Sequence, residues 1–334
     1  MTVIDVFTNR EYLCGNIYPY NDLNIISSID PNKIPGLSHY QRPKSGGCCV
    51  RFITDSPEVK ICYSVTPPLT GNYPHVGISA QRGISCSYRR IKEVFWHNID
   101  CFYSRSDNGE ALIQSHRCVE NGELYELAVF LPIKCFISGL KIILNDGAAV
   151  HTCDSPKHRI TVLGGTVGYG LGVSSTHFLL NNLLARHIPE SYVTGVSFND
   201  SEVWNCYLTS LPYMEEIDHS EIILLESPYP IVDNDDVVKL VADVLRDLCG
   251  KTKGKIILWY KPCYKQVFEG WAPIVKKIIL DNRLSSRIFL NERFLLNDYR
   301  DFDMYMSSVN FVNDSGNIFI MKQIKEMIQE IWNT

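Results

Sequence analysis

The stretch most informative about the fold is the turn Ile160-Thr161-Val162-Leu163-Gly164-Gly165-Thr166-Val167-Gly168-Tyr169-Gly170. A short apolar run leads into glycines and a threonine, and a helical pattern begins a few residues later. This order is typical of a turn that raises a nucleophile at a sheet edge, because glycine permits positive φ and close approach of a substrate. Its N–H groups could also hold an anion. It could equally be a plain turn without a ligand, or a phosphate loop, although the Gly-Lys-Ser/Thr ending of a P-loop is missing.

Downstream of this turn, predicted strands alternate with predicted helices. The strands are expected at Ile160–Leu163, Tyr192–Val196, Glu221–Leu225, Lys255–Tyr260 and Arg287–Leu290. The helices are expected at Thr176–Arg186, Glu202–Met214, Asp236–Cys249, Val267–Asp281 and Ile318–Trp332. We expect Asp235-Asp236 to cap the third helix and Gly250 to follow its end. The alternation predicts an α/β/α domain over residues 158–334, with a parallel sheet and a site at the C-terminal ends of its strands.

Residues 1–150 follow a different pattern. Short β-branched and aromatic runs are separated by Gly, Pro and Asn-Asp turns, and they occur at Cys48–Thr54, Val59–Val65, Leu124–Phe130 and Leu140–Leu144. Such runs at short intervals are typical of an antiparallel sandwich. A chain of 334 residues is long for one core. We therefore predict a jelly-roll-like β-sandwich domain over residues 1–150, ahead of the α/β/α domain.

The composition is that of an ordinary globular protein, with 45% hydrophobic residues, 21% charged residues and a net charge of −5. No block of Lys and Arg stands out, so we expect no nucleic acid partner. No apolar run approaches the ~18 residues of a membrane span, and no signal peptide is visible. We therefore expect no membrane association, a cytoplasmic location and reduced cysteines. No Cys/His spacing resembles a metal site, so we predict neither a metal nor a cofactor.

The turn is similar to the first motif of the SGNH (GDSL-type) hydrolases. Thr166 falls where that family has its nucleophilic serine, and the motif's remaining positions are Gly164, Gly165, Val167 and Gly170. Upstream, Ser45–Ser56 and Leu124–Pro132 resemble strands of the β-sandwich that precedes a subset of SGNH domains. The resemblance implies a flavodoxin-like three-layer domain and chemistry on acyl or carbohydrate esters.

The same resemblance suggests oxyanion- or ligand-binding residues around the nucleophile position. Gly195 takes the place of the family's oxyanion glycine, Gly165 could donate a second N–H, and Asn199 could line the same rim. The asparagine that the family has after its third strand is missing. Here the chain reads Glu226-Ser227-Pro228-Tyr229-Pro230, so Tyr229 is a substitute donor. Glu226 could bind a cation or a sugar hydroxyl, or be a solvated rim residue, which we favour.

The family's last motif, Asp-x-x-His-Pro-x-Asp-x-Gly, is degenerate in this chain. Ser308 stands at the aspartate position and Phe311 at the histidine position, and a slip of one residue would place Asn310 there instead. None of these side chains can act as the base. Asp314 and Gly316 keep the tail of the motif, and we expect them to cap the last helix.

The missing imidazole decides between the functional hypotheses. The last histidine of the chain is His219, and His177, just after the turn, is expected to face solvent. A threonine without a base is a poor nucleophile, since a positioned base contributes ~10²–10⁴-fold. The acidic group Asp298, Asp301 and Asp303 could hold a metal or supply a base, but a solvated acidic turn is expected.

We therefore favour a pseudoenzyme that binds an acylated or glycosylated small ligand, or a protein partner, without cleaving it. The alternative is a diverged acyl-ester hydrolase or acyltransferase that acts on an acylated small molecule or carbohydrate through Thr166. A third possibility is a complex-forming protein whose interface is the aromatic stretch near Phe95–Tyr103. The sequence does not determine the oligomeric state.

Overall fold

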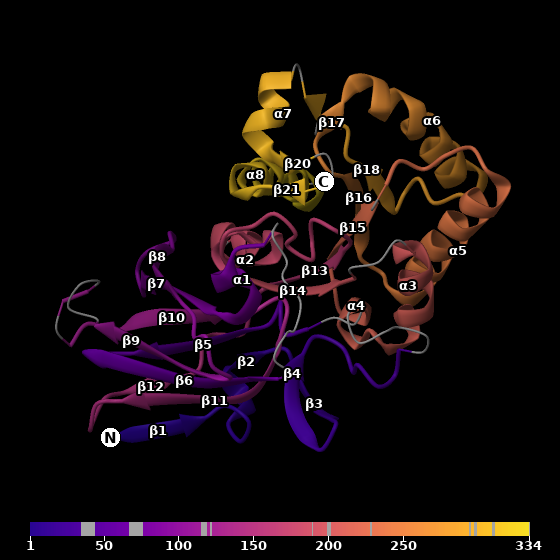
Figure 1. Cartoon of the computed structure of the whole chain (residues 1–334). Coiled ribbons are helices and arrows are strands. Elements are labelled where there is room, and N and C mark those ends of the chain that lie inside the picture. The colour runs from indigo at the N-terminus through magenta and orange to yellow at the C-terminus, as the bar shows by residue number, and fades with distance from the viewer. Residues whose placement is uncertain are drawn as a thin grey trace.

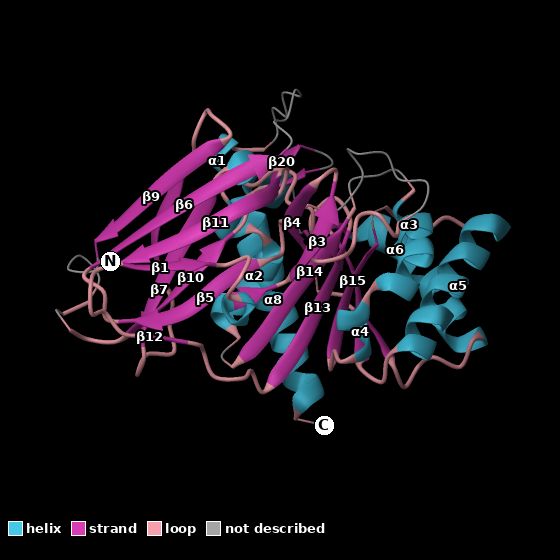
Figure 2. Ribbon diagram, turned by 90° about the horizontal axis from the view of Figure 1, so that it is seen from below, coloured by secondary structure: helices cyan, strands magenta, loops and turns pink. Residues whose placement is uncertain are grey.

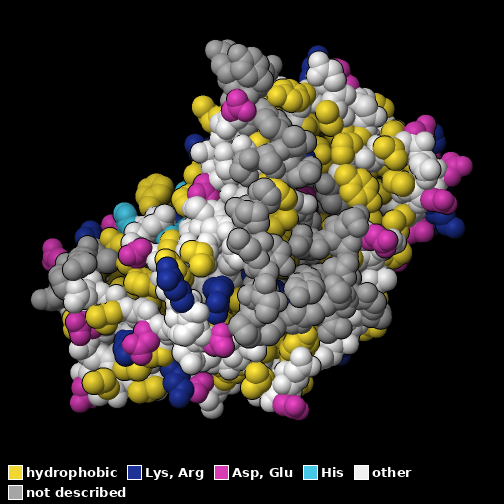
Figure 3. Space-filling view, viewed as in Figure 1, with side chains coloured by type: hydrophobic (Ala, Val, Ile, Leu, Met, Phe, Trp, Pro, Cys, Tyr) yellow, Lys and Arg dark blue, Asp and Glu magenta, His cyan; other side chains and the backbone are white. Residues whose placement is uncertain are grey.

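In its described residues, the computed structural model combines two six-stranded antiparallel sheets with one five-stranded parallel sheet and two small two-stranded sheets (Figure 1). It describes residues 1–34, 44–66, 76–114, 119–120, 122–188, 190–198, 202–227, 229–293, 295–296, 299–308 and 311–333. Among these residues, none of the helices has the length and apolarity that crossing a membrane requires. On the face drawn in Figure 3, acidic and basic side chains are interspersed over the described residues.

The antiparallel sheets form the N-terminal sandwich. One has the order β3-β4-β11-β6-β9, with β1 also pairing with β11. Its strands are β1 (Thr2–Asp5), β3 (Asn16–Tyr20), β4 (Leu23–Ser27), β6 (Glu58–Thr66), β9 (Asn108–Gln114) and β11 (Phe136–Leu144). The other has the order β12-β5-β10-β7-β8, with β2 also pairing with β5. Its strands are β2 (Leu13–Cys14), β5 (Cys49–Thr54), β7 (Ile84–Arg90), β8 (His97–Phe102), β10 (Tyr125–Phe130) and β12 (Val150–His151). All four predicted strands are confirmed.

The sandwich is held together by the inward-facing residues of its two sheets. Along β6, every second side chain is buried, as expected for a strand with one face on a core. Val59 and Ile61 from this strand share a core with Phe52 and Leu127 from the opposite sheet. The alternation of apolar and polar residues in the sequence of β6 therefore matches the alternation of buried and exposed side chains that a sandwich core requires.

The parallel sheet has the order β14-β13-β15-β16-β18. Its strands are β13 (His158–Gly164), β14 (Ser191–Ser197), β15 (Ile222–Ser227), β16 (Lys255–Tyr260) and β18 (Ile288–Leu290). All five predicted strands are confirmed. The helical segments are η3 (Thr176–Phe178), α2 (Leu180–His187), α3 (Val203–Ser210), η4 (Leu211–Tyr213), α4 (Glu215–Asp218), α5 (Asp235–Lys251), α6 (Lys265–Asp281), α7 (Tyr299–Tyr305) and α8 (Asp314–Trp332). The smaller elements are η1 (Arg10–Tyr12), α1 (Ile78–Arg82), β17 (Cys263–Tyr264), β19 (Leu295–Leu296), β20 (Met306–Ser308) and β21 (Phe311–Val312).

Helices cover both faces of the parallel sheet, which gives three layers. In β15, Ile222 and Leu224 pack with α2 and α8, whereas Ile223 and Leu225 pack with α3, α5 and α6. A strand covered on both sides is apolar throughout, as this one is. Figures 1 and 2 show α5 and α6 on the flank of the sheet that lies away from the sandwich.

The last helix begins at Asp314, ahead of its predicted start at Ile318, and two other predicted helices are interrupted or cut short. The first is split at Leu179, which is extended, because the η3 turn docks on the sandwich through Thr176 and His177. The second ends early and continues as a 3-10 turn that contains Pro212, which cannot donate the next helical hydrogen bond.

The ends of α5 also differ from the prediction. The side chain of Asn234 caps this helix by accepting from the backbone nitrogens of Asp236 and Val237, so the cap lies one residue earlier than expected. At the other end, the helix runs through Gly250 and stops at Lys251. A Cβ on Gly250 would meet nothing within 4 Å, so no close approach requires glycine there.

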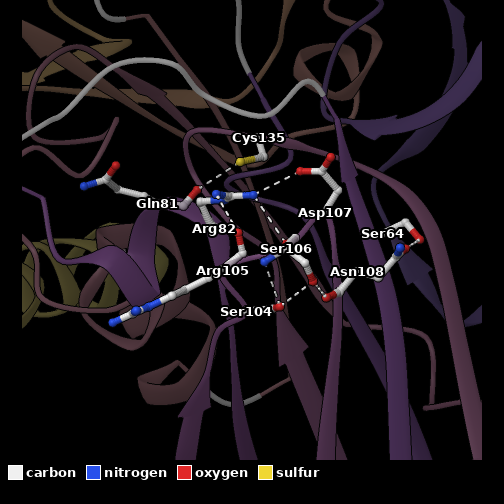
Figure 4. A network of polar contacts seen from close by, with 9 residues as sticks. All are labelled: Ser64, Gln81, Arg82, Ser104, Arg105, Ser106, Asp107, Asn108 and Cys135. Carbon is white, nitrogen blue, oxygen red and sulfur yellow. Dashed lines mark hydrogen bonds and ion pairs between the residues drawn. The ribbon is translucent and has the colours of Figure 1, made fainter.

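The connection between β8 and β9 is ordered by polar contacts around Arg82 (Figure 4). The Arg82 guanidinium donates to the carbonyls of Arg105 and Ser106, both at 3.4 Å, and forms an ion pair of 3.1 Å with Asp107. The hydroxyl of Ser106 donates to the Asn108 carbonyl at 2.6 Å. These contacts fix the C-terminal end of β8 against α1.

The sandwich contacts the α/β domain along the outer edge of β14. The N–H of Phe198 donates to the Gly164 carbonyl at 2.9 Å. The alternation of a parallel ladder therefore turns the N–H and C=O of Gly195 away from β13, toward the open edge. A Cβ on Gly47, whose φ is +92°, would lie 2.6 Å from the Gly195 carbonyl oxygen. The Gly47 turn of the sandwich thus lies directly on this edge.

Candidate functional site

The Thr166 turn is a compact loop at the C-terminal end of β13. Within it, the N–H of Tyr169 donates to the Gly165 carbonyl at 2.8 Å, and the N–H of Leu171 donates to the Thr166 carbonyl at 3.1 Å. Thr166 itself is half-buried. A Cβ on Gly168 would lie 2.5 Å from the Gly164 Cα, so two segments of the backbone are in direct contact at this point. Glycine at this position is therefore a steric requirement of the turn.

The carboxylate of Glu226 fills the inside of this turn. Its Oε2 accepts hydrogen bonds from the backbone nitrogens of Gly165 and Gly168, both at 2.8 Å, and its Oε1 accepts from Val167 at 2.9 Å. Glu226 is only 1% exposed, so the interpretation as a solvated rim residue is wrong. The reason is the pleat of β15, which places Glu226 on the same face as Leu224, directly under the turn.

The backbone N–H groups of the turn therefore form an anion site that already holds an internal anion. Burial raises the pKa of Glu226 to about 7, and the hydrogen bonds from the turn, followed by the Lys261 charge, oppose this rise. Burial in turn lowers the pKa of Lys261, which the Glu226 charge opposes. Lys261 directly follows β16, so it belongs to the same C-terminal edge of the sheet.

Tyr207 is a structural residue of this site that no sequence motif indicated. Its hydroxyl lies 3.2 Å from the Leu163 carbonyl and 3.1 Å from the Glu226 carbonyl, so it contacts the ends of β13 and β15. The sequence feature that could have identified it is a tyrosine on the inward face of a predicted helix. A buried tyrosine hydroxyl needs a hydrogen-bond partner, so such a residue is expected to contact backbone carbonyls. Lys261 could have been found because it follows a predicted strand at the edge that carries Glu226.

The degenerate last motif is brought beside the turn. Phe311, at the family's histidine position, packs against an apolar cluster of Val76, Ala80, Ile133, Tyr169, Leu171, Val173 and Leu179. Tyr169 and Leu171 belong to the loop that carries Thr166. An aromatic ring therefore occupies the neighbourhood in which the resemblance would place an imidazole.

The tail of that motif lies at the start of α8, where Gly316 takes part in the cap as predicted but Asp314 does not. Asn313 caps α8, because its side chain accepts from the Gly316 nitrogen at 2.9 Å. Asp314 instead accepts from the Ser174 nitrogen at 2.9 Å and from the Ser174 hydroxyl at 2.6 Å. The last helix is thereby tied to the loop that follows Thr166.

The remaining predicted residues are not all gathered at the turn. Gly195 lies inside β14 and not after it, with its N–H directed at the sandwich edge. Tyr229 is half-buried, and its ring packs on the core shared with α3, α5 and α6. Ser308 ends β20, but its side chain lies outside the described part of the chain, as do Asn199 and Asn310.

His177 does not face solvent, contrary to the expectation from the sequence. It is 3% exposed, and its Nε2 lies 2.9 Å from the Cys86 carbonyl of the sandwich. Burial, followed by the Arg186 charge, lowers the pKa of His177 to about 4. Its ring therefore serves the contact between the two domains.

Among the described residues, no cavity large enough for a ligand is lined by the Thr166 turn in the two cases that follow. A cavity of about 10 Å³, bounded in part by Gly168, Tyr169 and Ser197, has room for hardly one water. A larger cavity of about 580 Å³ is lined by sandwich residues and by the residues before β13, at the opposite end of that strand. Among the described residues, no cluster of three or more His, Cys, Asp or Glu is placed to hold a metal ion.

Together, the sandwich, the order of the parallel sheet and the turn after its first strand define an SGNH-type hydrolase fold. A solved protein described as a GDSL-like lipase from Bacteroides ovatus ATCC 8483 has a TM-score of 0.72 at 17% identity, covering 99% of this chain and 98% of its own. A salicylyl-acyltransferase from a tetracycline biosynthetic pathway has a TM-score of 0.70 at 12% identity, with coverages of 99% and 97%. A family two carbohydrate esterase from Cellvibrio japonicus has a TM-score of 0.64 at 10% identity, with coverages of 99% and 98%. No family model and no curated protein matches the chain.

Proposed function

We propose that this chain is a pseudoenzyme of the SGNH fold, which binds an acylated or glycosylated small ligand without cleaving it. The observation that carries the proposal is the Glu226 carboxylate inside the Thr166 turn. Ester cleavage by this fold builds negative charge on an oxygen beside the nucleophile, and donors aimed at that oxygen lower the barrier. Here the N–H groups of Gly165, Val167 and Gly168 are already used by Glu226.

The charge of Glu226 also opposes the reaction. Above pH about 7 the group carries a negative charge directly under the turn. A second negative charge on a nearby oxyanion would be repelled, and the repulsion is strong because the carboxylate is buried. The apolar Phe311 beside the turn offers no proton acceptor in place of the missing histidine.

The ligand class comes from the proteins that share the fold. These proteins are described as a lipase, a salicylyl-acyltransferase and a carbohydrate esterase. An acyl group is common to these three chemistries, and the carbohydrate comes from the esterase. We therefore propose this class as the first one to test, by analogy of fold.

The test compares turnover with binding on the purified full chain. We expect hydrolysis of p-nitrophenyl acetate and of acetylated xylo-oligosaccharide to equal that of Thr166→Ala, while calorimetry shows binding of the acetylated oligosaccharide. Thr209→Ala, which removes an exposed threonine on α3, controls for the substitution itself. Turnover that exceeds the Thr166→Ala background would overturn the proposal in favour of a diverged ester hydrolase or acyltransferase.

We also propose a cytoplasmic location. Every cysteine that the structure describes is a free thiol, which suits a reducing compartment. Counting free thiols in protein isolated under denaturing, acid-quenched conditions tests this, and recovery of disulfide-linked cysteines would contradict it.

A further inference from the structure

A thiol and an imidazole meet where the sandwich contacts the α/β domain. The Cys101 Sγ of β8 lies 3.3 Å from the Nδ1 of His177 in η3. Cys101 is half-buried, and β8 is at the edge of its sheet, so the thiol lies near the surface. Neither residue takes part in the site around Thr166.

The hydrogen bond on the far side of the ring fixes which nitrogen carries the proton. The Nε2 of His177 lies 2.9 Å from the Cys86 carbonyl, and a carbonyl oxygen can only accept. Nε2 therefore carries the hydrogen, and Nδ1 presents its lone pair to Cys101. Because burial and the Arg186 charge lower the pKa of His177 to about 4, the ring is neutral near pH 7.

Two further groups surround the sulfur. The Ser85 hydroxyl donates to Cys101 Sγ at 3.5 Å, and the Thr176 hydroxyl donates to the Ser85 oxygen at 2.5 Å. This direction of donation leaves the hydrogen of Ser85 aimed at the sulfur. A hydroxyl donor stabilises the charge that develops when a thiol loses its proton.

Arg186 provides a positive charge at the same place. Its guanidinium binds the His177 carbonyl and the Asn98 side chain. Burial lowers the pKa of Arg186 to about 10, and Cys101 opposes this shift, so the guanidinium and the sulfur interact electrostatically. Asp100 is the nearby acidic group, and its charge favours protonation of His177.

We propose that Cys101 is an activated thiol that reacts with soft carbon electrophiles. The arrangement has parts that nucleophilic cysteines use: a hydrogen-bond acceptor on the thiol, a carbonyl that orients this acceptor, and a cation nearby. The thiol hydrogen is directed at His177 Nδ1, which turns the sulfur lone pairs outward, and the sulfur attacks the electrophilic carbon. A C–S bond forms as the bond to the leaving group breaks, and the thiol proton is lost to solvent.

Because the thiol and its acceptor come from different domains, this site exists only when the two domains are docked. The reaction rate of Cys101 therefore depends both on the contact between the domains and on the groups that surround the sulfur. It does not depend on the proposed function of the Thr166 turn, so either proposal can fail alone.

The experiment is timed alkylation of the full native chain with iodoacetamide, with each cysteine quantified by mass spectrometry. Iodide is the leaving group in this reaction. We expect Cys101 to react about tenfold faster than the half-buried references Cys62 and Cys249. His177→Gln, which keeps a donor for the Cys86 carbonyl but has no lone pair at the Nδ1 position, should remove most of this advantage.

Buried Cys86, in the strand next to Cys101, controls for unfolding. If His177→Gln leaves Cys86 protected and Cys101 as fast as before, the proposal is overturned. If the variant exposes Cys86, Ser85→Ala replaces it as the test, with an expected slowing of several-fold. Equal rates at Cys101 and both reference cysteines in the unaltered protein would overturn the proposal without any variant.

Discussion

The Oε2 atom of Glu226 lies 2.8 Å from the backbone nitrogen of Gly165, although 61 residues separate the two along the chain. Through this bond and two others, a carboxylate at the end of β15 determines the shape of the loop after β13. The turn that resembles a nucleophile loop is therefore held from within by an acidic side chain.

The first prediction concerns the stability that this contact provides. Glu226→Ala should lower the free energy of unfolding by about 3–5 kcal/mol, because it leaves three buried N–H groups without an acceptor. Urea denaturation followed by circular dichroism measures the change. Asp247→Ala, which removes an exposed carboxylate on α5, should stay within about 0.5 kcal/mol of the unaltered protein. Equal effects of the two substitutions would contradict the role of Glu226.

The second prediction concerns pH. The pKa of Glu226 is raised from 4.5 to about 7 in the folded chain, so the folded state binds this proton more tightly than the unfolded state. The resulting stabilisation is complete below pH 4.5 and is lost as the pH rises through about 7. Relative to Glu226→Gln, the unaltered protein should lose on the order of 3 kcal/mol over this range. Parallel stability curves for the two proteins would refute this.

The third prediction contrasts two glycines. Gly168→Ala should lower the stability by about 1–3 kcal/mol, because the added Cβ would lie 2.5 Å from the Gly164 Cα. Gly270→Ala is the matched control, since Gly270 is exposed inside α6 and a Cβ there meets nothing within 4 Å. That change should raise the stability by about 1 kcal/mol. Thermal melting of both variants distinguishes a steric effect from a general effect of alanine.

The fourth prediction concerns the tie between α8 and the loop after Thr166. Asp314→Ala should cost about 1 kcal/mol, since the bonds to Ser174 are charge-assisted but exposed. A double-mutant cycle with Ser174→Ala should give a coupling of about 0.5 kcal/mol, which isolates the hydroxyl bond from the bond to the backbone nitrogen. Ser315→Ala, at the neighbouring exposed position, should show no coupling with Ser174→Ala.

The layers of the fold were predictable because they depend on local pattern. The alternation of apolar residues in β6 and the uninterrupted apolar run of β15 each report how many faces of a strand are covered. The split at Leu179 was not predictable in this way. It arises from docking of Thr176 and His177 on the sandwich, which is a contact between segments far apart in sequence.

The site was predictable only in part. The glycines after β13 mark a turn in which the backbone comes close to itself, and the structure places that turn at the C-terminal edge of the sheet. The acceptor for its N–H groups could not be read from the turn, because Glu226 comes from another strand. The direction of the Gly195 N–H depends on the register between β13 and β14, which a single strand does not reveal.

The Gly47 turn on the outer edge of β14 has a consequence for the α/β domain as a separate unit. β14 is the last strand on its side of the parallel sheet, and the N–H and C=O of Gly195 point outward. A fragment that starts at residue 158 would expose this edge to other copies of itself, and an unprotected edge is a template for intermolecular pairing. By covering the edge of β14, the sandwich therefore protects the α/β domain from aggregation.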